Sequence, residues 1–338
     1  MNKFLKKISF FRKYLAWNIP VFMLLGLAFG YLFDARFLRA AVLPLTVLMI
    51  YPMMVTLNMK SVFSKCHYKL EAVTQTINFV AIPLFGFMLG KVFFKASPLT
   101  AFGLLLISLL PTSGMTISWT GFAKGNVNVA IKMTIIGLVI GSLVTPLYGN
   151  VLMGEVVEIP LLKMFQQIGF AIFIPMILGY MTQVVLVRRY GAEHFQKQIK
   201  PAFPTLSTLA VLGIIFVAMA LKSKSIISNP GTILGMIVPL LLFYSINYIL
   251  ISLVARALFA RADAVALVYG SVMRNLSVAL AISVVAFGKE GLEIALIIAV
   301  AYVVQVQSAA WYLKLVDKIF DKAPDDPALA DSKLSIAY

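Results

Sequence analysis

The chain has 338 residues, of which 61% are hydrophobic and only 12% are charged. Soluble globular domains are typically about 45–50% apolar and about 25% charged, so this composition excludes that class and indicates a membrane protein with several spans. The net charge of +16 does not indicate nucleic-acid binding, because Lys and Arg of membrane proteins collect in cytoplasmic loops. The single cysteine, Cys66, excludes an intrachain disulfide and a multi-cysteine metal site.

Apolar stretches of helix length recur along the whole chain. Ten of them predict membrane-spanning helices, at residues 14–33, 38–57, 70–94, 97–123, 127–153, 161–188, 204–222, 230–257, 262–288 and 291–314. The connecting loops are too short to hold a soluble domain, so we expect a single membrane domain followed by a polar cytoplasmic tail at 315–338. The first span follows a lysine-rich N-terminus and is too long for the apolar core of a signal peptide. We therefore expect it to remain in the mature protein as the first membrane helix.

The distribution of Lys and Arg predicts the orientation. If the spans alternate, about 19 of the 29 basic residues fall on the side of the two termini, about 8 fall on the other side, and two lie inside helices. Basic residues mark the cytoplasmic side. We therefore expect both termini in the cytoplasm and the protein in a plasma (inner) membrane of prokaryotic type.

The two halves of the chain resemble each other at a spacing of about 155–160 residues, a pattern typical of transporters. Three features recur: Ile19-Pro20 as Ile174-Pro175, Pro44 as Pro204, and the polar break Pro111–Gly114 as Ser271–Asn275. Five spans per half is an odd number, so the second repeat (161–314) should be inverted relative to the first (14–153). The alternative is that Pro and Gly are simply common in membrane helices.

The fourth predicted helix contains a polar interruption at Pro111–Gly114. Proline removes a helical hydrogen bond, and irregular backbone at membrane depth is tolerated only inside protein or beside a watery cavity. Four hydroxyl side chains would line this break: Thr112, Ser113, Thr116 and Ser118. They indicate a solute site, with a Ser/Thr seam between helices as the alternative.

The ninth predicted helix contains Arg274 in the middle of the apolar run 262–287. Its charge would lie roughly 18 Å from the nearer helix end at about 1.5 Å per residue, and burying a charge at that depth costs at least ~2.5 kcal/mol. No Asp or Glu lies deep in any span to pair with it. We interpret Arg274 as an anion-binding residue, with a structural cap on backbone carbonyls as the alternative. Ser271, Asn275 and Ser277 accompany it.

Further polar residues occur in the third and fifth predicted helices, namely Thr74, Gln75 and Asn78 in one and Lys132 and Thr134 in the other. Lys132 also has a simpler interpretation, since a lysine at that depth can extend to the headgroups. The two histidines, His67 and His194, fall in predicted loops, and the sequence has neither HExxH nor a Walker motif. We therefore expect no enzymatic activity and no direct coupling to ATP.

Three motifs carry a family resemblance: Ile50–Val55, the stretch from Ala123–Val127 to Thr145–Leu147, and Met273–Asn275 continuing to Ala279–Ala281. Over nearly its whole length the chain resembles the bile acid:sodium symporter superfamily, and its second helix is similar to the arsenite efflux branch. The resemblance implies an all-α fold of ten helices in two inverted five-helix repeats. A core domain (helices 3–5 and 8–10) would contain broken, crossing helices 4 and 9, beside a panel domain (helices 1, 2, 6 and 7).

The departures from the family pattern concern its ligands. Arsenite carriers have a cysteine and a glutamate at the positions of Thr112 and Ser277 here. Sodium symporters have ion ligands at the positions of Gly270, Ile117 and Arg274, and Lys132 stands next to another. Of the sodium-site positions only Asn78, Thr116 and Thr134 keep ligand character, so two fixed cations are expected near the places that sodium ions would occupy.

We therefore expect a secondary transporter of a small organic anion, without a cofactor and with sodium or proton coupling left open. The expected solute-binding residues are Thr112, Ser113, Thr116, Arg274, Asn275 and Ser277. The expected ion-site or ion-substituting residues are Asn78, Lys132, Thr134 and Arg274. Two alternatives remain, an arsenite or metalloid efflux carrier and a membrane solute sensor without net transport.

Overall fold

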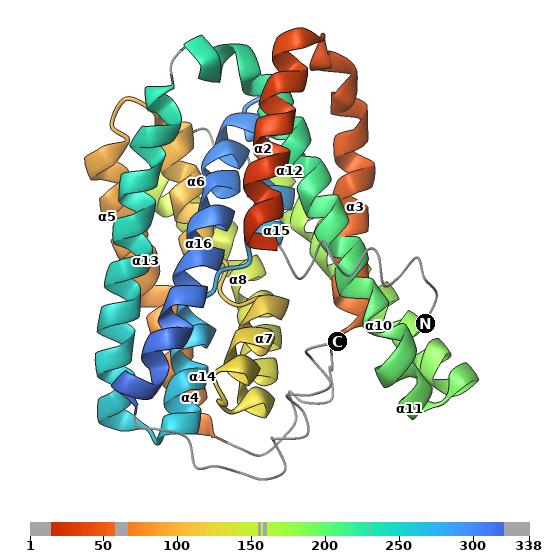
Figure 1. Cartoon of the computed structure of the whole chain (residues 1–338), viewed down its shortest axis with the longest axis vertical. Helices are drawn as coiled ribbons and strands as arrows, with labels where there is room; N and C mark the ends of the chain where they lie inside the picture. The colour runs from red at the N-terminus through yellow and green to blue at the C-terminus, as the bar shows by residue number, and fades with distance from the viewer. Residues whose placement is uncertain (1–14, 58–66, 155–156, 158–160, 229, 321–338) are drawn as a thin grey trace.

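A computed structural model describes residues 15–57, 67–154, 157, 161–228 and 230–320, and this part of the chain is helical throughout with short connections (Figure 1). The first half contains α2 (Leu15–Leu32), α3 (Arg39–Val55), α4 (Tyr68–Thr76), α5 (Ile82–Phe93), α6 (Pro98–Leu109), α7 (Gly114–Phe122) and α8 (Val127–Met153). A π-helical turn, Ile77–Ala81, joins α4 to α5 without a break.

The second half begins with α9 (Leu161–Ile168), which runs through a π-helical turn into α10 (Ile174–Tyr190). It continues with α11 (Ala192–His194), α12 (Ala202–Ser228), α13 (Gly231–Leu258), α14 (Arg261–Val272), α15 (Leu276–Phe287) and α16 (Gly291–Ile319). These helices suit a lipid environment for two reasons: their side chains are mostly apolar, and an α-helix satisfies its own backbone hydrogen bonds.

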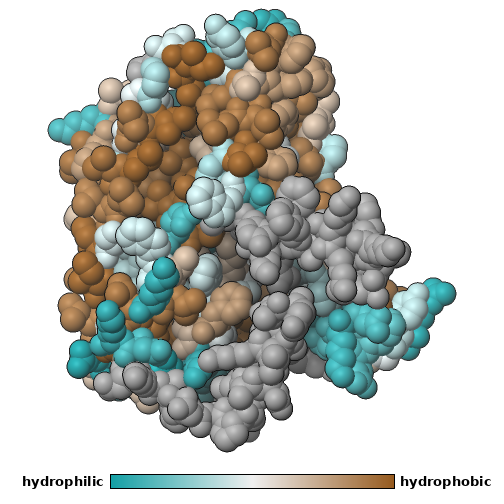
Figure 2. All heavy atoms as spheres, in the orientation of Figure 1, coloured by the Kyte–Doolittle hydropathy of each residue, from teal (hydrophilic) through white to brown (hydrophobic). Residues whose placement is uncertain are grey.

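Within the described residues, six helical segments are long and apolar enough to cross a membrane: Ala35–Val55, Tyr68–Phe93, Val127–Met153, Ala192–Lys224, Gly231–Leu258 and Gly291–Ile319. Shorter apolar helices include Trp17–Leu32, Pro98–Leu109 and Leu276–Phe287. Figure 2 shows hydrophobic residues over most of the visible face, with hydrophilic residues gathered toward its two ends. This pattern confirms a helical membrane protein with several spans.

The helices pack in two groups. In the first, which we call the panel group, α12 packs against α2 and α3, and α10 packs against α3. In the second, the core group, α13 and α15 pack on α16, α5 and α16 pack on α6, and α8 contacts α7 and α14. Figure 1 shows the panel helices on the right and the core helices on the left. Contacts of α16 with α2 and α12 join the two groups.

Two predicted boundaries are wrong. The tail was expected from residue 315, but α16 continues to Ile319, because Tyr312, Val316 and Phe320 form a buried stripe at helical spacing beneath the charged residues. The connection that contains His194 was expected to be a loop, but α11 and the π-helical turn Phe195–Ile199 fill it. The N-terminal lysines, Cys66 and the tail from residue 321 lie outside the described residues.

Candidate functional site

The two predicted helix breaks lie side by side. Between α6 and α7, and between α14 and α15, the helix is interrupted for a few residues. There Thr112 N donates to Met273 O at 2.8 Å, and Asn275 N donates to Leu110 O at 2.8 Å. These bonds form a short antiparallel bridge that pairs Pro111 with Arg274. Each break thus satisfies backbone groups that the other has freed, and the predicted meeting of the two broken helices is confirmed.

Both helices that start at this crossing begin with a side-chain cap. Ser113 Oγ accepts from Met115 N at 3.2 Å, and Thr116 Oγ1 accepts from Ser113 N at 3.0 Å, which completes a capping box at the start of α7. Asn275 Oδ1 accepts from Val278 N at 3.2 Å at the start of α15. The positive ends of two helix dipoles therefore lie at the crossing.

The backbone strain in the first break lies at Thr112 and not at Gly114. Thr112 has a φ of 58°, in the left-handed region, which costs a β-branched residue of order 1–3 kcal/mol. Its hydroxyl donates within the break to Pro111 O at 2.7 Å and contacts Thr134 O at 3.3 Å. Gly114 is the first residue of α7.

Arg274 is fully buried at the crossing, with 0% of its surface exposed. Its Nη1 donates to Asn78 Oδ1 at 2.8 Å and to Ser271 O at 2.6 Å. Its Nε donates to Ile107 O at 3.1 Å, and its Nη2 donates to Ser108 O. A guanidinium has five N–H donors, so these four bonds occupy most of them with oxygens of the protein itself.

The acceptors explain how a charge can be buried here without a carboxylate. Ile107 and Ser108 belong to the last turn of α6, and Ser271 belongs to the last turn of α14. The last carbonyls of a helix lack intrahelical donors and carry the negative end of its dipole. Arg274 therefore caps two helix C-termini at once, which is the structural role that the sequence left as an alternative to anion binding.

Gln305 on α16 completes the crossing and was missed by the sequence analysis. Its Oε1 accepts from Arg274 N at 2.8 Å, and its Nε2 donates to Arg274 O at 3.2 Å. Tyr244 Oη donates to the same Oε1 at 2.9 Å. An amide side chain in the middle of an apolar helix was the available signal, because such a group must find buried partners.

One side of the crossing is open. Gly114 is exposed, and a Cβ placed on it would meet nothing within 4 Å. Asn275 Nδ2 is buried and has no hydrogen-bond partner among the described residues. Ser277, the second residue of α15, shares a hydrogen bond with Tyr302 Oη at 2.7 Å. An unpartnered donor at the start of α15 and an exposed glycine at the start of α7 therefore mark this side of the crossing.

The structure does not bring all the predicted ion-site residues together. Asn78 lies against Arg274, and Thr134 packs against Thr112 while its own hydroxyl donates to Ala130 O at 2.7 Å. Lys132 lies elsewhere: it is only 5% exposed, and its Nζ lies 5.0 Å from the ring centre of Tyr68 on α4. The expectation that Lys132 could extend to the headgroups does not fit this burial.

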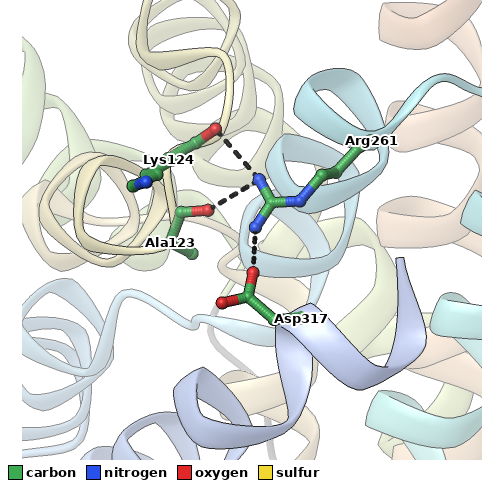
Figure 3. Close-up of polar contacts among 4 residues, drawn as sticks. All are labelled: Ala123, Lys124, Arg261 and Asp317. Atoms are coloured by element: carbon green, nitrogen blue, oxygen red, sulfur yellow. Dashed lines mark hydrogen bonds and ion pairs between the residues drawn. The ribbon is translucent and has the colours of Figure 1, made fainter. Parts of the chain in front are cut away.

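A second polar cluster joins the far ends of the core helices (Figure 3). Arg261 Nη1 donates to Ala123 O at 3.2 Å and to Lys124 O at 3.4 Å, and its Nη2 pairs with Asp317 at 2.5 Å. Beside it, Asn126 Nδ2 donates to Asp263 Oδ1 at 2.7 Å. These contacts tie the end of α7 to the start of α14 and the end of α16, and so they hold both broken helices at their outer ends.

Comparisons with known proteins place the chain in a family. The sequence profile described as "Sodium Bile acid symporter family" matches residues 43–229. An arsenical-resistance protein Acr3 of Alkaliphilus metalliredigens is 25% identical over 70% of this chain and 72% of its own length. A second Acr3, of Corynebacterium glutamicum, is 24% identical over 97% of this chain and 95% of its own.

Other relatives are named for a different solute. Sodium/bile acid cotransporter 7-A of Xenopus laevis is 25% identical over 62% of this chain and 62% of its own length. Proteins named for different solutes are thus similar to this chain in sequence, and the profile match covers more than half of the chain. The chain belongs to the sodium bile acid symporter family, a family of membrane transporters.

Proposed function

We propose that the chain is a secondary transporter that moves a small organic anion across the plasma membrane. One observation carries the proposal: a buried guanidinium occupies an oxygen cage at the crossing of two broken helices. Carriers with broken helices place solutes and coupling ions at such crossings. The permanent charge of Arg274 makes this crossing suited to an anion.

The solute would bind at the open side of the crossing, at the starts of α7 and α15. Helix N-termini attract anions through free N–H groups and the dipole. Ser113, Thr116 and Asn275 already cap these starts, and Asn275 Nδ2 has no partner among the described residues. Thr112 and Ser277 flank them. Arg274 would act from behind by its charge, because its donors bind Asn78 and three carbonyls.

The same geometry argues for transport without sodium at this place. Carbonyl and amide oxygens are the ligands that a hard cation prefers, and here the guanidinium of Arg274 binds them. A second cation about 4 Å away would be repelled by about 4 kcal/mol at an effective dielectric of about 20. Arg274 would therefore substitute for a mobile ion, with Asn78 as its side-chain ligand.

We further propose ten spans in two inverted repeats, with both termini in the cytoplasm. The order of elements along the chain supports this. The first five, in order, are α2, α3, α4–α5, α6/α7 and α8, and their counterparts in the second half are α9–α10, α12, α13, α14/α15 and α16. Each set has its broken helix in the fourth place. The excess of basic residues on the side of the termini supports the orientation.

Export of arsenite or a related metalloid is a second candidate, favoured by the two relatives named as arsenical-resistance proteins. Thr112 stands where a thiol is expected in that branch, and soft trivalent arsenic binds thiolates far better than hydroxyls. A solute sensor without net transport is the alternative of another class.

Thermal-shift measurements on the purified protein would decide among these functions. A panel of mono- and dicarboxylates and arsenite is tested in sodium and in potassium buffer, and each stabilising compound is then followed into proteoliposomes. Stabilisation and flux by a carboxylate support the proposal. A rise in melting temperature with arsenite alone supports the metalloid candidate. Binding without flux indicates the sensor.

A further inference from the structure

One buried carboxylate lies apart from the crossing, on the first turn of α4. Glu71 is 9% exposed, and its Oε1 accepts a hydrogen bond from Gln75 Nε2 at 2.6 Å, one helical turn further on. Its second oxygen, Oε2, is buried without a hydrogen-bond partner among the described residues, and so is Oε1 of Gln75. Each unsatisfied buried acceptor costs about 1–3 kcal/mol, so the arrangement lacks a donor.

A single proton would satisfy both atoms. A protonated carboxyl group has one O–H donor, and a carboxamide has both an acceptor and donors. The two groups can therefore form a ring in which the amide N–H donates to one carboxyl oxygen and the acid O–H donates to the amide oxygen. The first of these bonds is present, and the two unpartnered oxygens are the atoms of the second. We propose that Glu71 and Gln75 form a proton-binding site.

The charged neighbours of this site are suited to a carboxyl group that binds and releases a proton. Lys132 on α8 lies close enough to Glu71 for an electrostatic interaction, while its Nζ lies over the ring of Tyr68. It stabilises the carboxylate when the proton leaves. Lys69, on the same helix, lies over the ring of Phe259. On α14, Asp263 pairs with His67 at 3.3 Å and with Asn126.

The site is connected to the crossing by one face of one helix. Glu71, Gln75 and Asn78 follow each other at steps of four and three residues, which places them on a common face. Asn78 Oδ1 accepts from Arg274, and Asn78 Nδ2 donates to Gly270 O at 3.1 Å. About 10 Å of helix separates Glu71 from Asn78 at about 1.5 Å per residue. The next step rests on the proposed function: in a transporter, the proton bound by Glu71 and Gln75 would be the coupling ion.

Infrared spectroscopy tests the proton site without a solute. The full-length protein in lipid nanodiscs is taken from neutral to alkaline buffer, and the C=O stretching band of a protonated carboxylic acid is followed in H₂O and D₂O. We expect the wild type to show this band in neutral buffer and to lose it in alkaline buffer. Glu71→Gln should lack it. The control Glu293→Gln should keep it, because Glu293 is ion-paired with Lys222 at 3.7 Å and its side chain is 38% exposed.

Lys132→Met gives a second test that does not require the Glu71 variant to fold. Loss of the neighbouring cation disfavours the carboxylate, so the band should persist to more alkaline buffer than in the wild type. Absence of the band from the neutral wild type, its survival in Glu71→Gln, or an unchanged titration in Lys132→Met would overturn the site. None of these readouts requires transport, so a failure of the proposed function leaves the proton site standing.

Discussion

At the scale of single residues, Arg274 shows what sequence reasoning can and cannot provide. It lies deep in an apolar run, and no Asp or Glu lies deep in any predicted span to pair with it. These two observations predicted that Arg274 has a structural or functional role inside the protein. Its partners could not be predicted, because three of the four acceptors are main-chain carbonyls, which every residue possesses. Gln305 and Glu71 were missed for a related reason: their importance depends on which helix faces them.

Arg274→Lys should lower the melting temperature although it keeps the charge. An ammonium has three donors and no planar fork, so at least one of the four oxygens would lose its partner, at a cost of about 1–3 kcal/mol. Arg36→Lys is a matched control, because Arg36 forms an exposed ion pair with Asp34. Equal melting temperatures for Arg274→Lys and wild type would contradict the cap.

Gln305→Leu should also destabilise the crossing. Both backbone groups of Arg274 would lose the partner that they share, and each unsatisfied group costs about 1–3 kcal/mol. The control is Gln307→Leu, two residues further along α16 at a partly exposed position. Denaturant midpoints measured in the same detergent would compare the two, and a smaller loss for Gln305→Leu than for its control would count against its role.

At the scale of elements, the two breaks could be predicted because proline and clustered polar residues interrupt an apolar helix visibly. Their meeting was predicted from the two polar breaks and from the family resemblance, and the bridge between Pro111 and Arg274 confirms it. The end of α16 was placed wrongly because charges at Lys314, Asp317 and Lys318 lower the local hydropathy while a buried stripe continues beneath them. Tertiary packing decides such boundaries, and the local hydropathy of a sequence does not reflect it.

Close helix packing in the core group can be tested at Gly103 on α6. A Cβ there would lie 3.0 Å from Ile294 O on α16 and would clash with Ile297. Gly103→Ala should therefore force α6 and α16 apart and lower stability by about 1–3 kcal/mol. Gly235→Ala on α13 is the control, since nothing lies within 4 Å of its Cβ position, and there alanine should be neutral or slightly stabilising.

At the scale of the whole molecule, the orientation rests on the charge distribution and can be tested by labelling. In a Cys66→Ser background, a cysteine at the exposed position Lys289 should react with a membrane-impermeant maleimide added outside intact cells. A cysteine at Lys197 should react only after the cells are opened. The opposite pattern, or equal labelling from outside at both positions, would refute the proposed ten-span topology.

The central claim is that Arg274 takes the place of a mobile sodium ion at the helix crossing. The most direct measurement is the melting temperature of purified wild type and Arg274→Gln in matched sodium and potassium buffers. We expect the wild type to melt at the same temperature in both. Arg274→Gln should melt lower in potassium and recover in part in sodium, because the vacated oxygens can bind a small hard cation. A wild type stabilised by sodium, together with a variant that ignores it, would contradict the claim.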